Sequence, residues 1–397
     1  MLEIVGLGGI LALGAFVLLV VGTLGLVLWA RRLVAQHALQ DLEVDLIRVP
    51  LATPGHAIAL HRLALPRPQR FRTPVIVCHG MAVNRFSMDA HQDGQGSDRL
   101  SLARTLRRAG FDVFLLELRG RGNALVPPGA DWSVDDEVRE DVPAAIDRVC
   151  QETGARDLLW VGHSKGSILQ LMLHSRELPA AAKVRGVVAI GSPSTVRFQR
   201  EKLGFLVPVG ELLLKIFGRL PFRRSAPLLT PLAPVLHRVG GRWETLLEMN
   251  PPASLRHIFA SIFEDVSGGV LRQMLTWVRH PDGALLGTDG FVYEQHFDRI
   301  RVPLLLIAGA RDLLAPPEAV GWVRDRAKNA EITWILAAKA NGFSADYGHG
   351  DLVLGERAPE EIFPPIVAWL SAHAEPAEVE LPSSAQPGEM APISSST

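Results

Sequence analysis

Short, continuous apolar runs alternate with segments of helical spacing over most of this chain, and this alternation constrains its fold more than any other feature. The runs cover residues 74–78, 111–118, 157–161, 184–190, 303–308 and 332–336. Strands that are apolar on both faces need cover on both sides, and helices between consecutive strands make those strands parallel. The pattern therefore predicts an α/β fold, with a mostly parallel sheet and helices on both of its faces. Strand-like stretches at residues 42–50 and 57–65 precede these runs.

One long segment, from Ser192 to Arg301, interrupts the alternation. It is rich in proline and carries apolar residues at helical spacing, so it predicts a helical cap inserted at about residues 192–301. The whole α/β domain is expected at residues 42–373. The tail at residues 374–397 is rich in Pro, Ser, Ala and Glu without periodicity. Such a composition predicts disorder.

The N-terminal segment is strongly apolar, with no charged side chain in residues 4–30. A bilayer core of about 30 Å is crossed by about 20 apolar helical residues, so the sequence predicts a transmembrane anchor at residues 1–34. Trp29 suits the interface, and the basic pair Arg31 and Arg32 favours a cytoplasmic location for the main domain of a single-pass membrane protein. A cleaved signal peptide is the alternative, but it needs a basic start and a shorter apolar core.

Composition excludes several classes of partner. The 397 residues have a formal net charge of −1, and no basic run is long enough to follow a phosphate backbone, so nucleic acid is not an expected partner. The two cysteines, Cys78 and Cys150, are too few for a disulfide framework, a zinc site or an iron–sulfur cluster. The sequence therefore predicts neither a metal nor a cofactor.

The sharpest motif is Gly162-His163-Ser164-Lys165-Gly166, which follows the apolar run 157–161 and begins a helical segment. A G-x-S-x-G sequence at such a junction is typical of a strained turn that exposes the serine hydroxyl next to free helix N–H groups. The flanking glycines allow the close backbone packing that this turn needs. Ser164 is therefore the predicted nucleophile, with an ordinary strand–turn–helix joint as the alternative.

A serine nucleophile needs a base and an acid, which in this arrangement follow it in the order acid, then histidine. Asp312 comes just after the run 303–308, and His349 lies in the loop after the run 332–336. Side chains at the carboxyl ends of parallel strands meet at one edge of the sheet. Ser164, Asp312 and His349 are therefore the predicted catalytic triad. Asp346 and Asp351 are rival acids, but neither follows a strand end.

An oxyanion hole is expected from two backbone N–H groups. One belongs to Lys165, the residue after the nucleophile, and the other to Met81, after the turn at Gly80 that ends the first parallel strand. His79 is interpreted as a structural hydrogen-bonding residue and not as a second base.

These motifs together resemble the α/β-hydrolase superfamily. The resemblance rests on His79-Gly80, Gly162-His163-Ser164-Lys165-Gly166, Gly309-Ala310-Arg311-Asp312 and Tyr347-Gly348-His349-Gly350-Asp351-Leu352. The last stretch is similar to the histidine motif of the acid lipase branch, and parts are similar to polyhydroxyalkanoate synthase relatives. Those synthases use Cys where this chain has Ser164, and acid lipases are secreted and cleaved, whereas this chain has an apparent anchor.

The resemblance and the motifs imply a serine hydrolase that cleaves a carboxylic ester or thioester with an apolar acyl group, through a triad and an acyl-enzyme. The expected substrate is a small-molecule ester or a lipid, met at a membrane. Two alternatives stay open: an acyltransferase that uses the same triad, and a non-catalytic membrane-anchored scaffold.

Overall fold

The computed structural model describes residues 2–40, 42, 44–65, 68–91, 98–204, 206–235 and 252–377. In this part of the chain, eight strands form one sheet in the order β1-β2-β4-β3-β5-β6-β7-β8. The strands are β1 (Val44–Pro50), β2 (Ala57–Leu63), β3 (Val75–Cys78), β4 (Val113–Glu117), β5 (Leu158–His163), β6 (Val184–Ile190), β7 (Leu304–Gly309) and β8 (Ile332–Ala337). Strand β2 is antiparallel to β1 and β4, and the other neighbours are parallel. The predicted mostly parallel sheet is confirmed.

Both faces of the sheet are buried, which explains the continuous apolar runs. In β5, Leu158 and Trp160 pack into the core on one face, whereas Leu159 and Val161 pack into the core on the other. Because successive strand residues point to opposite faces, a strand in the middle of the molecule must be apolar at every position.

Helices cover both faces. The first core contains apolar side chains of α4 and α5, and the second contains those of α2 and α15. The helical elements around the sheet are α2 (Leu102–Arg108), α3 (Val134–Asp136), the π-helical turn η2 (Glu137–Asp141), α4 (Val142–Thr153), α5 (Lys165–Ser175), η3 (Pro179–Lys183), α12 (Pro317–Gly321), η6 (Lys339–Asn341), α13 (Asp351–Leu354), α14 (Ala358–Glu361) and α15 (Phe363–His373).

One helix is shorter than the sequence pattern suggests. Apolar spacing favours a helix from Pro317 to Lys328, but α12 ends at Gly321. The reason is Ser194, whose hydroxyl accepts from the Val323 N–H at 2.9 Å and donates to the Ala319 carbonyl oxygen at 2.9 Å. The side chain thereby occupies both groups of one i→i−4 helical bond, and the chain continues as turns.

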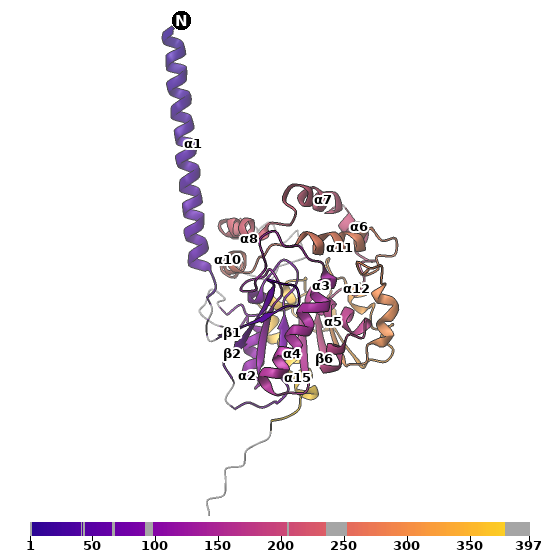
Figure 1. Ribbon diagram of the computed structural model, residues 1–397. Coiled ribbons are helices and arrows are strands. Elements are labelled where there is room, and N and C mark those ends of the chain that lie inside the picture. Colours follow the sequence, from indigo (N-terminus) through magenta and orange to yellow (C-terminus); the bar gives the residue numbers. More distant parts are fainter. Residues whose placement is uncertain are drawn as a thin grey trace, which may run out of the picture.

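The chain between β6 and β7 is helical and lies mainly beyond one end of the strands (Figure 1). Its elements are α6 (Arg200–Gly204), α7 (Leu206–Phe217), α8 (Phe222–Ser225), η4 (Ala226–Leu232), α10 (Pro252–Ser261), α11 (Gly268–Arg279) and η5 (Tyr293–Arg299). We refer to residues 191–303 as the inserted segment. Whether it works as a cap over the site, with the boundaries expected from the sequence, stays a prediction.

A single long helix, α1 (Leu2–His37), forms the N-terminal part of the chain and projects from the body (Figure 1). Its section from Val17 to His37 is long and apolar enough to cross a membrane, and most of its side chains there are exposed. The helix continues past the predicted end of the anchor at residue 34. The helix contacts η4 and α10, and the His37 carbonyl oxygen at its end accepts from His257 Nδ1 at 2.8 Å.

The ordered domain continues beyond the predicted start of the tail at residue 374. The Glu375 N–H donates to Thr73 Oγ1 at 2.9 Å, and the Ala377 N–H donates to the Arg70 carbonyl oxygen at 2.8 Å. These bonds hold residues 375–377 against the segment before β3. Residues 378–397, the rest of the predicted disordered tail, lie outside the described residues.

Candidate active site

Ser164 occupies a strained turn between β5 and α5. Its backbone angles, φ 53° and ψ −121°, are rare for a residue with a Cβ atom. Such a conformation costs of order 1–3 kcal/mol and persists only where the surroundings enforce it. Here the Ser164 N–H donates to the Ile190 carbonyl oxygen at 2.8 Å, and Ser192 Oγ donates to the Ser164 carbonyl oxygen at 2.8 Å. The last residue of β6 and the segment just after it therefore hold the turn from both sides.

The two motif glycines are required by close packing. A Cβ atom on Gly162 would lie 2.5 Å from Ser167 Oγ, and one on Gly166 would lie 2.6 Å from the Cys78 carbonyl oxygen. Gly80 is also close to the turn, because a Cβ atom there would lie 3.3 Å from Ser164 Cβ. The loop after β3, which carries the expected second oxyanion donor, thus packs directly against the serine turn.

Asp312 and His349 are joined across the ends of β7 and β8. Asp312 Oδ2 lies 2.8 Å from His349 Nδ1, and both side chains are buried. The other oxygen, Oδ1, accepts from the backbone N–H groups of Leu314 at 2.8 Å and Ala315 at 2.7 Å. Each carboxylate oxygen therefore has a separate set of donors, which fixes the carboxylate plane relative to the imidazole.

Ser164 and His349 border the same small cavity, of about 160 Å³. Its other walls are mainly apolar: Met81, Val83, Ile262, Phe263, Leu314, Val353 and Leu354. Within the described residues no hydrogen bond joins Ser164 Oγ to the histidine, and such bonds often tighten only when substrate is bound. The fold thus gathers Ser164, Asp312 and His349 at one edge of the sheet.

The rival acids are engaged elsewhere. Asp346 Oδ1 accepts from the Lys339 N–H at 2.9 Å. Asp351, buried at the start of α13, accepts from the Gly348 N–H at 3.3 Å. Of the three aspartates, Asp312 is the one that contacts Nδ1 of His349.

Lys165 has a buried side chain, for which the sequence left two positions open, in solvent or against a carboxylate; the structure shows the second. Its ammonium forms an ion pair with Glu137, the first residue of η2, and both side chains are almost completely inaccessible. Burial lowers the pKa of Lys165, and Glu137 opposes that shift. Glu137 is a member of the site region that sequence reasoning missed, and no local signal reveals it, because the two residues meet only through packing.

Arg121 lies nearby with no exposed surface, and its guanidinium nitrogens have no hydrogen-bond partner in the described part of the chain. Its positive charge contributes to lowering the pKa of Lys165. The loop after β4 therefore adds a second buried cation close to Lys165.

Two buried histidines flank the site and are neutral at ordinary pH. Burial is the main cause that lowers the pKa of His79 to about 3, and Arg121 adds to it. Burial and the nearby His349 lower the pKa of His163 to about 3. His79 Nδ1 donates to the Gly80 carbonyl oxygen at 2.7 Å, and His163 Nε2 lies 3.1 Å from the His349 carbonyl oxygen. Both therefore shape the backbone around Ser164.

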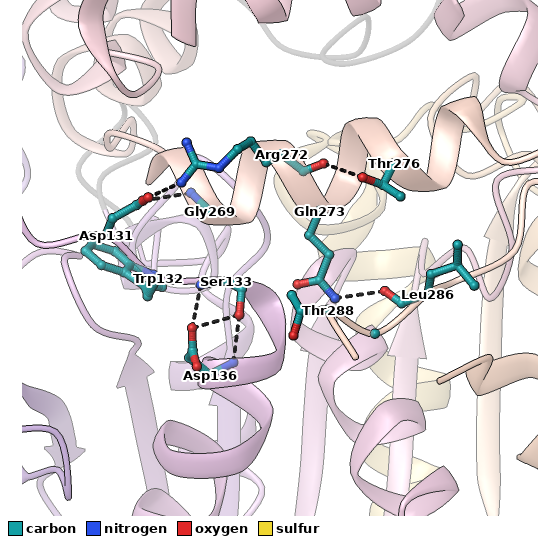
Figure 2. Close-up of a pocket in the computed structure, with 11 residues that line it drawn as sticks. Asp131, Trp132, Ser133, Asp136, Gly269, Arg272, Gln273, Thr276, Leu286 and Thr288 are labelled. Atoms are coloured by element: carbon teal, nitrogen blue, oxygen red, sulfur yellow. Dashed lines mark hydrogen bonds and ion pairs between the residues drawn. The ribbon is translucent and has the colours of Figure 1, made fainter. Parts of the chain in front are cut away.

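A larger cavity of about 590 Å³ lies between α3 and α11, away from the three residues (Figure 2). Its polar groups are bonded to each other: Asp131 pairs with Arg272 and accepts from the Gly269 N–H at 2.7 Å. Gln273 Nε2 donates to the Leu286 carbonyl oxygen at 2.9 Å. The Asp131 contacts attach α11 to the sheet domain, and the polar groups that line this cavity form no aligned reactive pair.

Comparison with known proteins agrees with this geometry. Residues 73–338 match the family model described as the alpha/beta hydrolase fold. The chain belongs to the α/β-hydrolase family. It is 26% identical over 305 residues to human gastric triacylglycerol lipase, covering 68% of this chain and 74% of that protein. It is 23% identical over 304 residues to human lipase member K, covering 69% and 74%.

Among solved structures, an esterase from Exiguobacterium antarcticum has a TM-score of 0.52 at 14% identity, with 82% of this chain and 98% of that chain covered. At this identity the likeness concerns the fold alone. The resemblance expected from the sequence is thereby confirmed: this α/β-hydrolase has relatives named lipases.

Proposed function

We propose that this α/β-hydrolase is a serine esterase that cleaves carboxylic esters or thioesters with an apolar acyl group. Ser164 is the nucleophile, His349 the general base and Asp312 the acid that orients it. One observation carries the proposal: His349 is bonded to a buried carboxylate and borders the same apolar cavity as a serine held in a strained turn. Relatives named lipases support the substrate class.

The reaction follows from these positions. His349 Nε2 takes the proton of Ser164 Oγ as the oxygen attacks the acyl carbonyl carbon, and Asp312 stabilises the imidazolium that forms. The N–H groups of Met81 and Lys165 bind the oxyanion. Collapse of the intermediate expels the alcohol or thiol, which receives its proton from His349. A water molecule then attacks the acyl-enzyme by the same route and releases the acid.

The cavity beside Ser164 takes the acyl group. It is smaller than the roughly 300–1,000 Å³ of pockets that enclose a whole drug-sized ligand. At about 160 Å³ and with apolar walls, it holds only part of a long chain. Ile262 and Phe263 belong to the inserted segment, so this segment serves as a cap that contributes to acyl selection.

Helix α1 anchors the enzyme in a membrane. Its apolar length supports a single crossing, and Arg31 and Arg32 on the side of the main domain support a cytoplasmic location for the site. Carbonate extraction of cell membranes tests this assignment. Full-length protein should stay in the pellet, and the same chain without residues 1–34 should be released; recovery of full-length protein in the soluble fraction would refute it.

A fluorophosphonate probe tests the catalytic assignment. An unactivated serine does not attack phosphorus at useful rates, so labelling reports a serine with a working base. We expect wild type to be labelled and Ser164→Ala to lose both labelling and ester hydrolysis. Ser87 borders the same cavity, and its hydroxyl donates to the Asn84 carbonyl oxygen, so Ser87→Ala is the matched control that keeps labelling.

Folded wild type that takes up no probe would favour the scaffold alternative. Product analysis with an added alcohol separates hydrolysis from transfer. The free acid is the expected main product, whereas a dominant new ester would assign the acyl-enzyme to acyl transfer.

A further inference from the structure

The inserted segment exposes an unusually apolar surface along α7 and η4. Leu212, Ile216 and Phe217 in α7 are each more than half exposed, as are Leu228 in η4 and Val235 just after it. Single exposed apolar residues are ordinary, but a group of large ones on neighbouring elements marks a surface that meets another apolar phase. We call the exposed side of α7, α8 and η4 the α7–η4 face.

This face lies on the side of the body from which α1 emerges (Figure 1). Helix α1 contacts η4 and α10, and the Leu39 N–H donates to Ser261 Oγ at 2.8 Å, just after the last turn. Ala30 is buried, whereas Trp29 before it is half exposed. The body of the protein therefore first contacts α1 near residue 30, where the apolar run ends and the basic pair Arg31 and Arg32 follows.

The charge on this face suits an anionic surface. Residues 206–235 contain Lys215, Arg219, Arg223 and Arg224 against one carboxylate, Glu211, in a chain with a net charge of −1. Arg223 is paired with Glu264 at 3.5 Å, so the excess of positive charge comes mainly from Lys215, Arg219 and Arg224. All four cations are exposed. A second copy docked symmetrically through the same face would bring like charges together, whereas acidic lipid headgroups would neutralise them.

We propose that the α7–η4 face rests in the headgroup region of an anionic bilayer, next to the point where α1 enters it. The inference depends on the proposed anchoring by α1, and it assigns a second membrane contact that apolar and basic side chains make together. Since α10 packs on η4 and leads into Ile262 and Phe263 of the catalytic cavity, this contact places the mouth of the site beside lipid.

Depth-dependent fluorescence quenching in the full-length chain tests the proposal. Cys150→Ser removes the accessible native thiol, and Cys78 is completely buried. Single cysteines are then introduced at Leu212 or Leu232 on the face, at Leu24 in α1, and at Arg156, and each is labelled with an environment-sensitive dye. Arg156 is the matched control, with a side chain that is 94% exposed, at the amino end of β5.

The chains are reconstituted into phosphatidylglycerol-containing vesicles whose lipids carry a nitroxide near the headgroup, with aqueous iodide as the second quencher. We expect the lipid nitroxide to remove most of the emission at positions 212, 232 and 24, and iodide to quench only the dye at position 156. Replacing Arg219 and Arg224 by Gln should reduce nitroxide quenching at position 232 in these vesicles but not at position 24.

The controls separate the ways in which the idea fails. If iodide but not the lipid nitroxide quenched the dyes at positions 212 and 232, while lipid quenched the dye at position 24, the docking would be overturned and the anchor would stand. If neither quencher reached the dyes at positions 212 and 232, the α7–η4 face would be assigned to a protein partner, and the proposed docking on the bilayer would be overturned as well. An unquenched dye at position 24 would refute the anchor, and the docking with it. Circular dichroism confirms that each labelled variant is folded.

Discussion

Asp312→Asn is the substitution that tests the proposed triad most sharply, because the two carboxylate oxygens have different partners. Oδ1 accepts from the Leu314 and Ala315 N–H groups, and Oδ2 faces His349 Nδ1 at 2.8 Å. An asparagine offers one acceptor oxygen and one donor NH₂ group in the same space. The orientation of this amide decides which ring nitrogen of His349 carries the proton.

The backbone donors set that orientation. If the NH₂ group replaced Oδ1, the buried Ala315 N–H and the partly buried Leu314 N–H would lose their acceptor, at a cost of up to about 1–3 kcal/mol each. The amide oxygen therefore keeps the bonds to Leu314 and Ala315, and the NH₂ group points at His349 Nδ1. That nitrogen must then accept, so the ring proton moves to Nε2, the atom proposed to act as the base for Ser164. Nε2 can no longer take the serine proton, and we expect turnover to fall by about 10⁴-fold, or about 5.5 kcal/mol.

The assay is steady-state hydrolysis of a p-nitrophenyl ester, with kcat and KM determined separately. The loss should appear in kcat, because the cavity walls that bind the acyl group are unchanged. Asp351→Asn is the matched control: a buried aspartate on the same side of the sheet, whose bond from the Gly348 N–H an amide oxygen can still accept. It should stay within about tenfold of wild type. Asp312→Asn activity above a tenth of wild type, in a protein that melts normally, would refute the orientation argument.

Three further predictions concern Glu137, His174 and Phe263. Glu137→Gln leaves Lys165 as a buried cation without its counter-ion, so urea denaturation should show a loss of about 3–5 kcal/mol in the free energy of unfolding; a loss under about 1 kcal/mol would contradict this. Burial lowers the pKa of His174 to about 4 from 6.5, so its contribution to stability is present above pH 6.5 and is lost as the pH falls toward 4. Between pH 7 and pH 5, wild type should therefore lose about 2 kcal/mol more than His174→Leu, and parallel stability curves would refute the shift. Phe263→Ala should move the preferred p-nitrophenyl ester toward longer chains, whereas Phe291→Ala, in the same inserted segment but not bordering the cavity, should leave the preference unchanged.

The sheet could be predicted from the sequence because burial on both faces leaves continuous apolar runs. The run 157–161 corresponds to β5, and the serine, aspartate and histidine each follow such a run, so the topology alone brings them to one edge. Their separations of many residues do not matter, because parallel strands align their carboxyl ends. For this reason the position of Ser164, Asp312 and His349 at one edge of the sheet could be predicted from the sequence.

Contacts made by single polar side chains could not be predicted. The Ser194 hydroxyl that shortens α12 lies 129 residues before Val323, and the Ser261 hydroxyl that holds the end of α1 lies 222 residues after Leu39. No local spacing encodes such pairs, because each depends on how the helices pack once the sheet has formed. The contact of Glu137 with Lys165 could not be predicted either, because the sequence around Glu137 predicts a uniform α-helix.

The π-helical turn η2 explains why that segment carries so many acids toward the interior. A π turn adds one residue to the helix and re-aims the side chains around it, and such turns are frequent at functional sites. Within η2, Glu137 pairs with Lys165, and Asp141 accepts from Arg119 Nε at 2.6 Å. Both acids are buried, so each offsets a buried cation that would otherwise be strongly destabilising. The lysine after Ser164, whose N–H is the proposed oxyanion donor, is thereby fixed through its side chain as well as through its helix. A loss of η2 geometry would loosen the oxyanion site without touching any of Ser164, Asp312 or His349.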